Sequence, residues 1–249
     1  MKHEVKKVWI LGATSTIAIS VARLYAEQGC ELLLVARSQD KLEQTKQDLL
    51  ARGAAAVEVR QIDLANEKNK LEKFQEMITA MNGFDVLLLA YGKLSDQDSC
   101  MTDLEALKED MNTNLVSAME WLTCGANHIE NAKQGCLAVI SSVAGDRGRR
   151  SNYVYGSAKS SLSTFAQGLQ HRLSVANGHV TLIKPGFVDT AMTSHLPKNG
   201  LWAKPDQVAK DIVKGIQKKK TVVFTPWFWR FIMLIIIHLP EKIFRRINI

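Results

Sequence analysis

Short runs of apolar residues recur along the chain and are separated by longer segments with helical spacing. The first run, residues 8–11, ends at Gly12, and a helical pattern follows over residues 17–25. Similar runs occupy residues 31–35, 57–62, 85–90, 136–141 and 179–183. Apolar strands that alternate with helices are typical of a parallel sheet covered on both faces. The pattern therefore predicts an α/β doubly wound, Rossmann-type fold, in which Ser38 caps a helix that reaches about Leu50.

The composition is that of one globular domain with an unusual end. Of the 249 residues, 46% are hydrophobic and 23% are charged, which suits a chain that buries one large core. No repeat or linker interrupts the chain, and the composition changes near residues 218–226. We therefore divide it into a body of residues 1–226 and a tail of residues 227–249.

Cysteine and histidine spacing gives no sign of a metal site. The four cysteines lack metal-binding or redox spacing and indicate unpaired thiols in a reducing compartment. The first residues run directly into the first strand, which leaves no room for a signal peptide. These features predict a cytoplasmic protein, and we assign no metal.

The positive charge of the chain lies at its C-terminal end. The net charge is +7, yet residues 1–213 hold 24 basic and 24 acidic residues. Residues 214–249 hold eight basic residues against Glu241 alone. Because these cations are interleaved with Trp and Ile, we expect peripheral contact with the inner face of a membrane and no binding of nucleic acid.

An apolar stretch fills the first part of the tail, over residues 227–239, and Pro240 ends it. A helix of thirteen residues spans about 20 Å, short of the ~30 Å hydrocarbon core of a bilayer. The stretch therefore predicts an amphipathic helix on a membrane surface. The alternative is a helix that packs on the body or on a partner subunit, and we expect the protein to form a homodimer.

Tyr155 and Lys159 are four residues apart, so a helix places both on one face. A free phenol has a pKa of ~10, and a neighbouring ammonium would lower it by stabilising the phenolate. Ser142, thirteen residues before Tyr155, directly follows a predicted strand and can hydrogen-bond the same substrate oxygen. Ser141 would face the other side of that strand, and Tyr153 lacks a lysine four residues later. The spacing predicts an acid/base site for a carbonyl or hydroxyl group.

The turn over residues 12–18 lies where the pyrophosphate of a dinucleotide meets a helix N-terminus, although it also fits a plain strand–helix turn. Arg37 ends the second predicted strand. An acidic residue there would bind the ribose 2′-hydroxyl of NAD(H), whereas a guanidinium would bind a 2′-phosphate. Arg37 therefore favours NADP(H) as the cofactor. The alternative is that Arg37 is only a solvated charge at a strand end.

Six blocks in the same order resemble the short-chain dehydrogenase/reductase family over nearly the whole chain. They are Gly12, Asp63-Leu64, Asn114 in Asn-Thr-Asn-Leu, Ile140-Ser-Ser-Val-Ala-Gly145, Tyr155-x-x-x-Lys159 and Pro185-Gly-Phe-Val-Asp-Thr190. The resemblance implies an oxidoreductase that transfers hydride between NADP(H) and a ketone or alcohol.

The resemblance also implies a role for each site residue. Tyr155 is the implied acid/base and Ser142 polarises the carbonyl. Lys159 tunes the phenol and binds the nicotinamide ribose, while Asn114 holds a water. The implied cofactor site comprises Gly12, Thr14, Ser15, Thr16, Ile17, Arg37, Asp63, Leu64, Ala90, Gly92, Tyr155, Lys159, Pro185, Gly186, Val188 and Thr190.

The chain departs from the family pattern in three places. The glycines of the first turn become Gly12, Thr16 and Ala18, and the usual Asn-Asn-Ala-Gly becomes Leu-Ala-Tyr-Gly at residues 89–92. Residues 221–226 replace the glycine-rich strand end that packs many relatives into tetramers. The modified turn and the Thr-Pro-Trp-Phe-Trp-Arg sequence of residues 225–230 resemble a subgroup near decaprenylphosphoryl-2-keto-ribose reductases, which implies a lipid-linked keto-sugar.

These observations predict an NADP(H)-dependent ketoreductase for a lipid-linked or membrane-partitioned ketone. One alternative is a reductase of soluble acyl or steroid-type substrates whose tail serves dimerisation. Another is a non-catalytic NADP-binding sensor, which would not need the Asn–Ser–Tyr–Lys set. Arg147, Arg149 and Arg150 are expected to form a solvated basic turn, although a lipid phosphate could use them, and residues 191–204 to shape the pocket.

Overall fold

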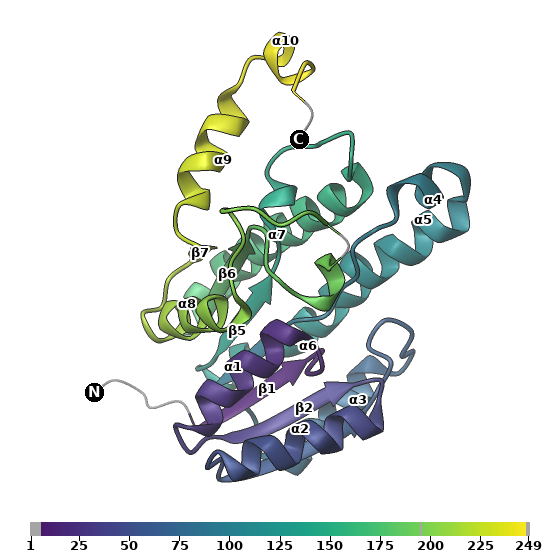
Figure 1. Ribbon diagram of the computed structural model, residues 1–249. Coiled ribbons are helices and arrows are strands. Elements are labelled where there is room, and N and C mark those ends of the chain that lie inside the picture. Colours follow the sequence, from purple (N-terminus) through teal and green to yellow (C-terminus); the bar gives the residue numbers. More distant parts are fainter. Residues whose placement is uncertain (1–5, 195, 248–249) are drawn as a thin grey trace.

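Seven parallel strands form one sheet in the computed structural model, which describes residues 6–194 and 196–247 (Figure 1). The strand order is β3-β2-β1-β4-β5-β6-β7. The strands are β1 (Lys7–Leu11), β2 (Glu31–Ala36), β3 (Ala56–Gln61), β4 (Val86–Leu89), β5 (Cys136–Ile140), β6 (His179–Pro185) and β7 (Val222–Thr225). All six predicted runs form strands, and β7 lies in the segment that replaces the glycine-rich strand end. The order confirms the predicted doubly wound fold.

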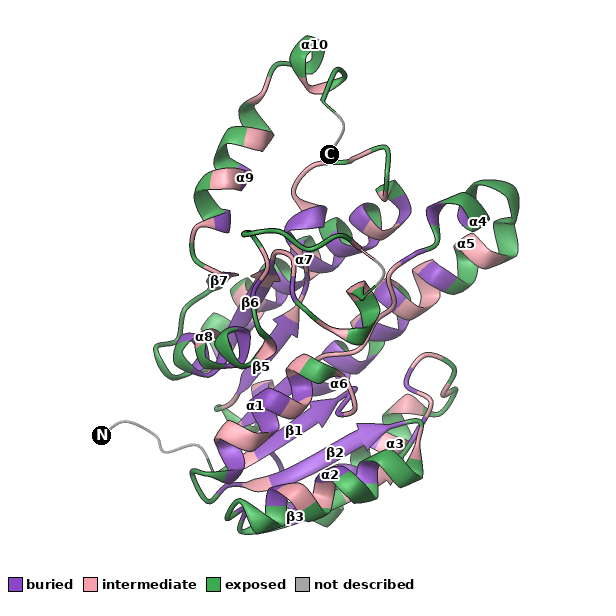
Figure 2. Cartoon of the chain, viewed as in Figure 1, coloured by how far each residue is buried: buried purple, intermediate pink, exposed green. Residues whose placement is uncertain are grey.

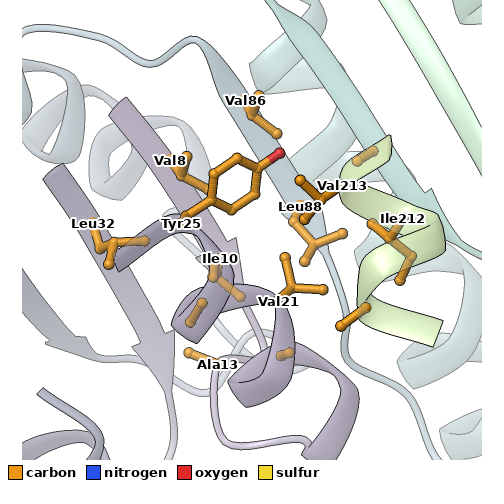
Figure 3. Close-up of a cluster of buried hydrophobic side chains, with 14 of the residues drawn as sticks. Val8, Ile10, Ala13, Val21, Tyr25, Leu32, Val86, Leu88, Ile212 and Val213 are labelled. Carbon is orange, nitrogen blue, oxygen red and sulfur yellow. The ribbon is translucent and has the colours of Figure 1, made fainter. Parts of the chain in front are cut away.

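Helices cover both faces of the sheet. The helices of one face are α1 (Thr16–Ala26), α2 (Gln39–Ala51) and α8 (Pro205–Gln217); those of the other are α3 (Lys70–Met81), α6 (Ser117–Ala132) and α7 (Tyr153–Ser174). Neighbouring strand residues enter opposite cores because side chains alternate across a strand, so Ile10 packs under α1 and Trp9 packs under α3. Figure 3 shows the first of these cores. Each fully buried Leu or Ile contributes roughly 1.5–3 kcal/mol, so the central strands supply much of the stability.

Serine side chains fix where the first two helices begin. Ser15 Oγ accepts a hydrogen bond from the N–H of Ala18 at 3.3 Å, and Ser38 Oγ accepts one from the N–H of Lys41 at 3.4 Å. Each bond satisfies a backbone donor that the first helical turn leaves open. The cap at Ser38 confirms the prediction, and α2 ends one residue beyond the predicted end, at Ala51.

The carboxyl ends of β1 and β4 meet where the chain crosses from one half of the sheet to the other. Short elements border this edge: α4 (Gln97–Thr102), α5 (Leu104–Met111), the π-helical turn η1 (Asn112–Val116) and the 3-10 turns η2 (Val143–Gly145) and η3 (Ala191–Thr193). Open α/β sheets bind ligands at such a crossing. The fold therefore places a site among these loops.

Two helices form the tail, α9 (Trp229–His238) and α10 (Glu241–Phe244), on either side of Pro240. The first helix begins two residues later than the predicted stretch. No helix among the described residues is long and apolar enough to cross a bilayer.

The two faces of α9 differ. Trp229 and Met233 are 3% and 1% exposed and pack with Val143 and Phe187 of the body. The opposite face is exposed, as Figure 2 shows. The tail therefore packs on the body through one face, as in the alternative of a helix that packs on the body. Its other face is apolar and exposed.

Candidate active site

A cleft of about 280 Å³ lies at the carboxyl ends of the central strands. Thirteen of the predicted site residues line it: Thr14, Ser15, Thr16, Ile17, Ala90, Gly92, Ser142, Tyr155, Lys159, Pro185, Gly186, Val188 and Thr190. A wider groove of about 1030 Å³ adjoins it and shares Gly92 and Met192 with it. Residues selected from segments far apart in the sequence therefore form most of the lining of this cleft.

The Ser142 hydroxyl hydrogen-bonds with the Tyr155 phenol, and both residues line the cleft. Ser142 follows β5, and Tyr155 lies in the first turn of α7. Ser141 also borders the cleft, but its hydroxyl is bonded to α7: it donates to the carbonyl of Lys159 at 2.9 Å and lies 2.8 Å from the Ser163 hydroxyl. Alternation along the strand therefore directs one serine hydroxyl to the cleft and the other to the helix.

Lys159 lies one turn after Tyr155, and its side chain is buried. Its Nζ donates to the carbonyl of Ile140 at 3.3 Å and lies 5.6 Å from the centroid of the Tyr155 ring. Burial lowers the pKa of Lys159 to about 8, so its side chain is mostly protonated at neutral pH.

The pKa of Tyr155 shifts in the direction opposite to the sequence expectation. Burial raises it to about 12, and the hydrogen bond with Ser142 opposes this only in part. The expectation was wrong because it counted the ammonium of Lys159 and neglected desolvation of the phenolate.

Asn114 lies inside η1, where one π-helical turn joins α5 to α6. Its Nδ2 donates to Asp110 at 3.0 Å, and its Oδ1 accepts the backbone N–H of Lys93 at 3.0 Å. It does not line the cleft, yet it is next to it. A Cβ on Gly92 would lie 2.8 Å from Asn114 Oδ1 and 3.4 Å from Lys159 Nζ, so only glycine lets the chain pass between them.

The turn before α1 fits the phosphates of a dinucleotide. Gly12 has a φ of +89°, and a Cβ there would lie 2.6 Å from the Cβ of Tyr91, so no other residue fits. Ser15 caps the helix, and the exposed Thr16 offers a hydroxyl at its N-terminus. A helix N-terminus that faces a cleft is a ready anion site. Gly12 does not itself line the cleft; it shapes the turn.

Besides Gly12, three predicted cofactor residues lie outside the cleft. Arg37 is exposed after β2, and its carbonyl accepts a hydrogen bond from Gln61 at the end of β3 at 3.0 Å. The Asp63 carboxylate accepts the backbone N–H of Ala65 at 3.1 Å. Leu64 is buried. Arg37 follows β2, and Asp63 and Leu64 follow β3, so all three lie after the two outermost strands on that side of the sheet.

In the basic turn after η2, Arg147 and Arg149 are not solvated, which corrects the sequence expectation for these two residues, whereas Arg150 is exposed. Arg147 donates to the carbonyls of Ile236 and Leu239 at the end of α9 and forms an ion pair with Glu241 at 3.2 Å. Its guanidinium lies 3.7 Å from the centroid of the Phe244 ring. Burial lowers the pKa of Arg149. Helix C-termini attract cations, but sequence spacing could not show that this helix lies beside Arg147.

The tail also contacts the loop after β6, which lines the cleft. A Cβ on Gly186 would lie 1.9 Å from the Trp229 indole nitrogen, so the indole occupies the space above that glycine. Trp229 packs edge-on against Phe187 at 5.5 Å, and Phe187 stacks on Trp202 at 5.4 Å. Sequence analysis missed this connection. It did expect residues 191–204 to shape the pocket, and Ala191, Met192 and Thr193 line the cleft.

The doubly wound sheet, the anion-binding turn and the buried Ser–Tyr–Lys group together define an oxidoreductase that uses a nicotinamide dinucleotide. Residues 6–200 match the model of the short chain dehydrogenase family. The chain belongs to this family.

Relatives of similar length agree with this assignment. An uncharacterized oxidoreductase of Mycobacterium tuberculosis is 34% identical over 239 residues, which cover 96% of each chain. Another, from Streptomyces coelicolor, is 32% identical and covers 97% of this chain and 96% of its own. The ketoacyl reductase HetN of Nostoc sp. is 27% identical over 88% of this chain and 77% of its own.

Solved structures share the fold. A short-chain dehydrogenase from Sphingobium yanoikuyae in complex with NADPH gives a TM-score of 0.82 at 22% identity and covers 92% of each chain. A bulky-bulky ketone specific alcohol dehydrogenase from Comamonas testosteroni gives 0.81 at 19% identity and covers 98% of this chain and 96% of its own.

Proposed function

We propose that the protein is an NADPH-dependent ketoreductase in which Tyr155 protonates the substrate oxygen. The observation that carries the proposal is the convergence of Ser142, Tyr155 and Lys159 in one cleft beside the N-terminus of α1. A non-catalytic sensor would need the turn at α1 but not this buried acid/base group.

The bound cofactor would supply the hydride. Ser142 and Tyr155 would hold the carbonyl oxygen between two hydroxyl groups, where negative charge develops during reduction. Tyr155 remains protonated at neutral pH because its pKa is about 12, so it is a proton donor in this direction. Lys159, protonated below about pH 8, would stabilise the phenolate that remains. Asn114 would hold a water beside Lys159.

Arg37 supports the choice of NADPH over NADH. It is exposed after β2, at the strand end where dinucleotide-binding folds contact the adenosine ribose. A guanidinium there would pair with a 2′-phosphate, and Asp63 and Leu64 would border the adenine.

We propose that the substrate is a lipid-linked or membrane-partitioned ketone, with a 2-keto-pentofuranosyl phosphopolyprenol as the first candidate. The wider groove supports a bulky substrate: Leu94, Met101 and Met192 line it, together with two cationic residues, Lys93 and Arg150, and two acidic ones, Asp96 and Asp98. The apolar residues suit a lipid chain, and the cations suit a phosphate. The likeness to a ketoacyl reductase favours an acyl-type ketone as the alternative.

Oxidation of NADPH by the full chain, followed at its absorbance with a panel of ketones, tests the proposal. The panel pairs each ketone with an analogue that carries a lipid chain. We expect turnover that is faster with the lipid-bearing member. Faster turnover of short acyl ketones would support the alternative, and absence of turnover with every ketone alongside tight NADPH binding would support a sensor.

We also propose that the tail docks on the anionic inner face of a membrane. Its outer face exposes Trp227, Phe231, Leu234, Ile235 and Ile237. Arg230, Lys242, Arg245 and Arg246 are exposed along the same tail, which gives it the charge that complements anionic lipid. The alternative occupant of this face is the tail of a second copy, in a homodimer.

A further inference from the structure

Asp110 is a buried carboxylate that none of the roles above uses. It lies one residue before the end of α5 and is 1% exposed. A buried charge is costly unless it is paired and hydrogen-bonded. Its Oδ2 accepts hydrogen bonds from the hydroxyl of Ser95 and from Nδ2 of Asn114, and its Oδ1 lies 3.6 Å from Nζ of Lys93. Lys93 and Ser95 line the wider groove, and Asn114 lies beside Gly92, which borders both the groove and the cleft.

Asp110 decides which way the Asn114 amide points. An ionised carboxylate only accepts hydrogen bonds, so Asn114 must turn its Nδ2 toward it. The Oδ1 of Asn114 is then directed to the N–H of Lys93 and to the space beside Gly92, which Lys159 Nζ borders from the other side. With the amide reversed, its N–H groups would face both the ammonium and the N–H of Lys93.

Asp110 also acts electrostatically on the acid/base pair. Its negative charge raises the pKa of Lys159, against the effect of burial, and raises that of Tyr155. Both effects preserve the protonated forms that reduction requires. On the solvent side lie Lys93, 42% exposed, and Glu109, 3.9 Å from Lys93, and the carboxylates of Asp96 and Asp98 line the same groove as Lys93. Cys100 of α4 is the other titratable neighbour, and its thiol carries no charge at neutral pH because burial and Asp110 raise its pKa.

We propose that Asp110 is a positioning residue that fixes the Asn114 amide and holds Lys159 in its ammonium form. This inference rests on the proposed reduction of a ketone by Tyr155. It assigns a function to a buried charge that would otherwise only reduce stability.

The test is the pH dependence of kcat/KM in Asp110→Asn. This substitution keeps the shape of the side chain and removes its charge, so the alkaline limb of the profile should move to lower pH by about one unit. Asp110→Glu restores the charge and should move the limb back toward the wild-type position. Glu109→Gln removes a negative charge from an exposed position on the same helix, and Glu109 also faces Lys93. The alkaline limb of this variant should coincide with that of the wild type.

The proposal would be overturned if the alkaline limb of Asp110→Asn stayed at its wild-type pH. It would also be overturned if the limb of Glu109→Gln moved as far as that of Asp110→Asn. If Asp110→Asn does not fold, the double variant Lys93→Met/Asp110→Asn removes both members of the ion pair and should show the same shift. Failure of the double variant to fold would mean that Asp110 serves folding alone, which also overturns the proposal. Absence of ketone reduction in the wild type would instead contradict the proposed function.

Discussion

At Tyr155 opposing effects act on one phenol: burial and, to a lesser extent, the charge of Asp110 raise its pKa, and the hydrogen bond with Ser142 lowers it. Burial prevails, as it does at Lys159, where it acts in the opposite direction because the charged form is the cation. The two shifts favour a neutral tyrosine beside an ammonium that is close to its titration range. This is the combination that a proton donor for an alkoxide requires.

We expect kcat/KM for reduction to be constant near neutral pH and to fall as the pH rises through about 8. The pKa of Lys159 is lowered from 10.5 to about 8, so the ammonium is present below that value and lost above it. Tyr155, at about 12, stays protonated throughout. A pH–rate profile between about pH 6 and 10 measures this limb. A profile that is flat to its upper end would contradict the assignment to Lys159.

Arg37 should set the cofactor preference. A charge-assisted pair with a 2′-phosphate is worth roughly 2 kcal/mol, so NADPH should bind about 30-fold more tightly than NADH. Arg37→Asp should reverse the order, whereas Lys210→Asp on the exposed side of α8 makes the same charge change elsewhere and should not. Fluorescence titration gives both dissociation constants. Equal dissociation constants for NADPH and NADH in the unmodified protein would show that Arg37 does not set the cofactor preference.

Among the elements, strands and their order follow from the sequence more directly than contacts between distant segments do. The apolar runs predicted β1 to β6 because these strands, apart from the edge strand β3, are buried on both faces. Tyr155, Lys159 and Ser142 could be placed together because helix and strand periodicity fix which side chains share a face. The packing of Trp229 over Gly186 could not be predicted, because no local pattern says where α9 docks.

The end of α9 depends on one side chain from the loop after Ser142. Arg147→Ala removes the donor that satisfies the carbonyls of Ile236 and Leu239. We expect amide hydrogen exchange in the last turn of α9 to accelerate by about tenfold or more, while exchange in the sheet stays unchanged.

Arg230→Ala is the matched control, since Arg230 is exposed on the same helix. It should leave exchange in the last turn near the wild-type rate. Equal acceleration in both variants would show that Arg147 does not hold the helix.

In the molecule as a whole, residues 1–213 are neutral, residues 214–249 carry the net charge of +7, and the tail leaves one apolar face outside. Composition and charge predicted this division, but not that the inner face of α9 would pack on the body beside the cleft. Deleting the tail would therefore uncover Val143 and Phe187 as well as remove the exposed face. Substitutions on the outer face separate the two effects.

Phe231→Asp with Ile235→Asp should reduce binding to anionic liposomes by about tenfold or more, because it places charge on the face proposed to enter the lipid. Leu71→Asp on α3, another exposed apolar position, should bind like the wild type. High salt should weaken binding of the wild type without abolishing it, since only the electrostatic part is screened. Cosedimentation with liposomes measures binding of the double variant, of Leu71→Asp and of the wild type at low and high salt. A wild-type chain that ignores liposomes at low salt but dimerises through this face would support the second copy as its occupant.

The most direct test of the central claim follows transfer of deuterium from deuterated NADPH to a ketone in the wild type, Tyr155→Phe and Tyr153→Phe. Tyr155→Phe keeps the ring and removes the proposed acid, so transfer should fall about 100-fold or more while NADPH still binds. Tyr153 is 42% exposed and has no lysine one turn on, so its variant should retain transfer close to that of the wild type. Equal losses in the two variants, or undiminished transfer in Tyr155→Phe, would contradict the account.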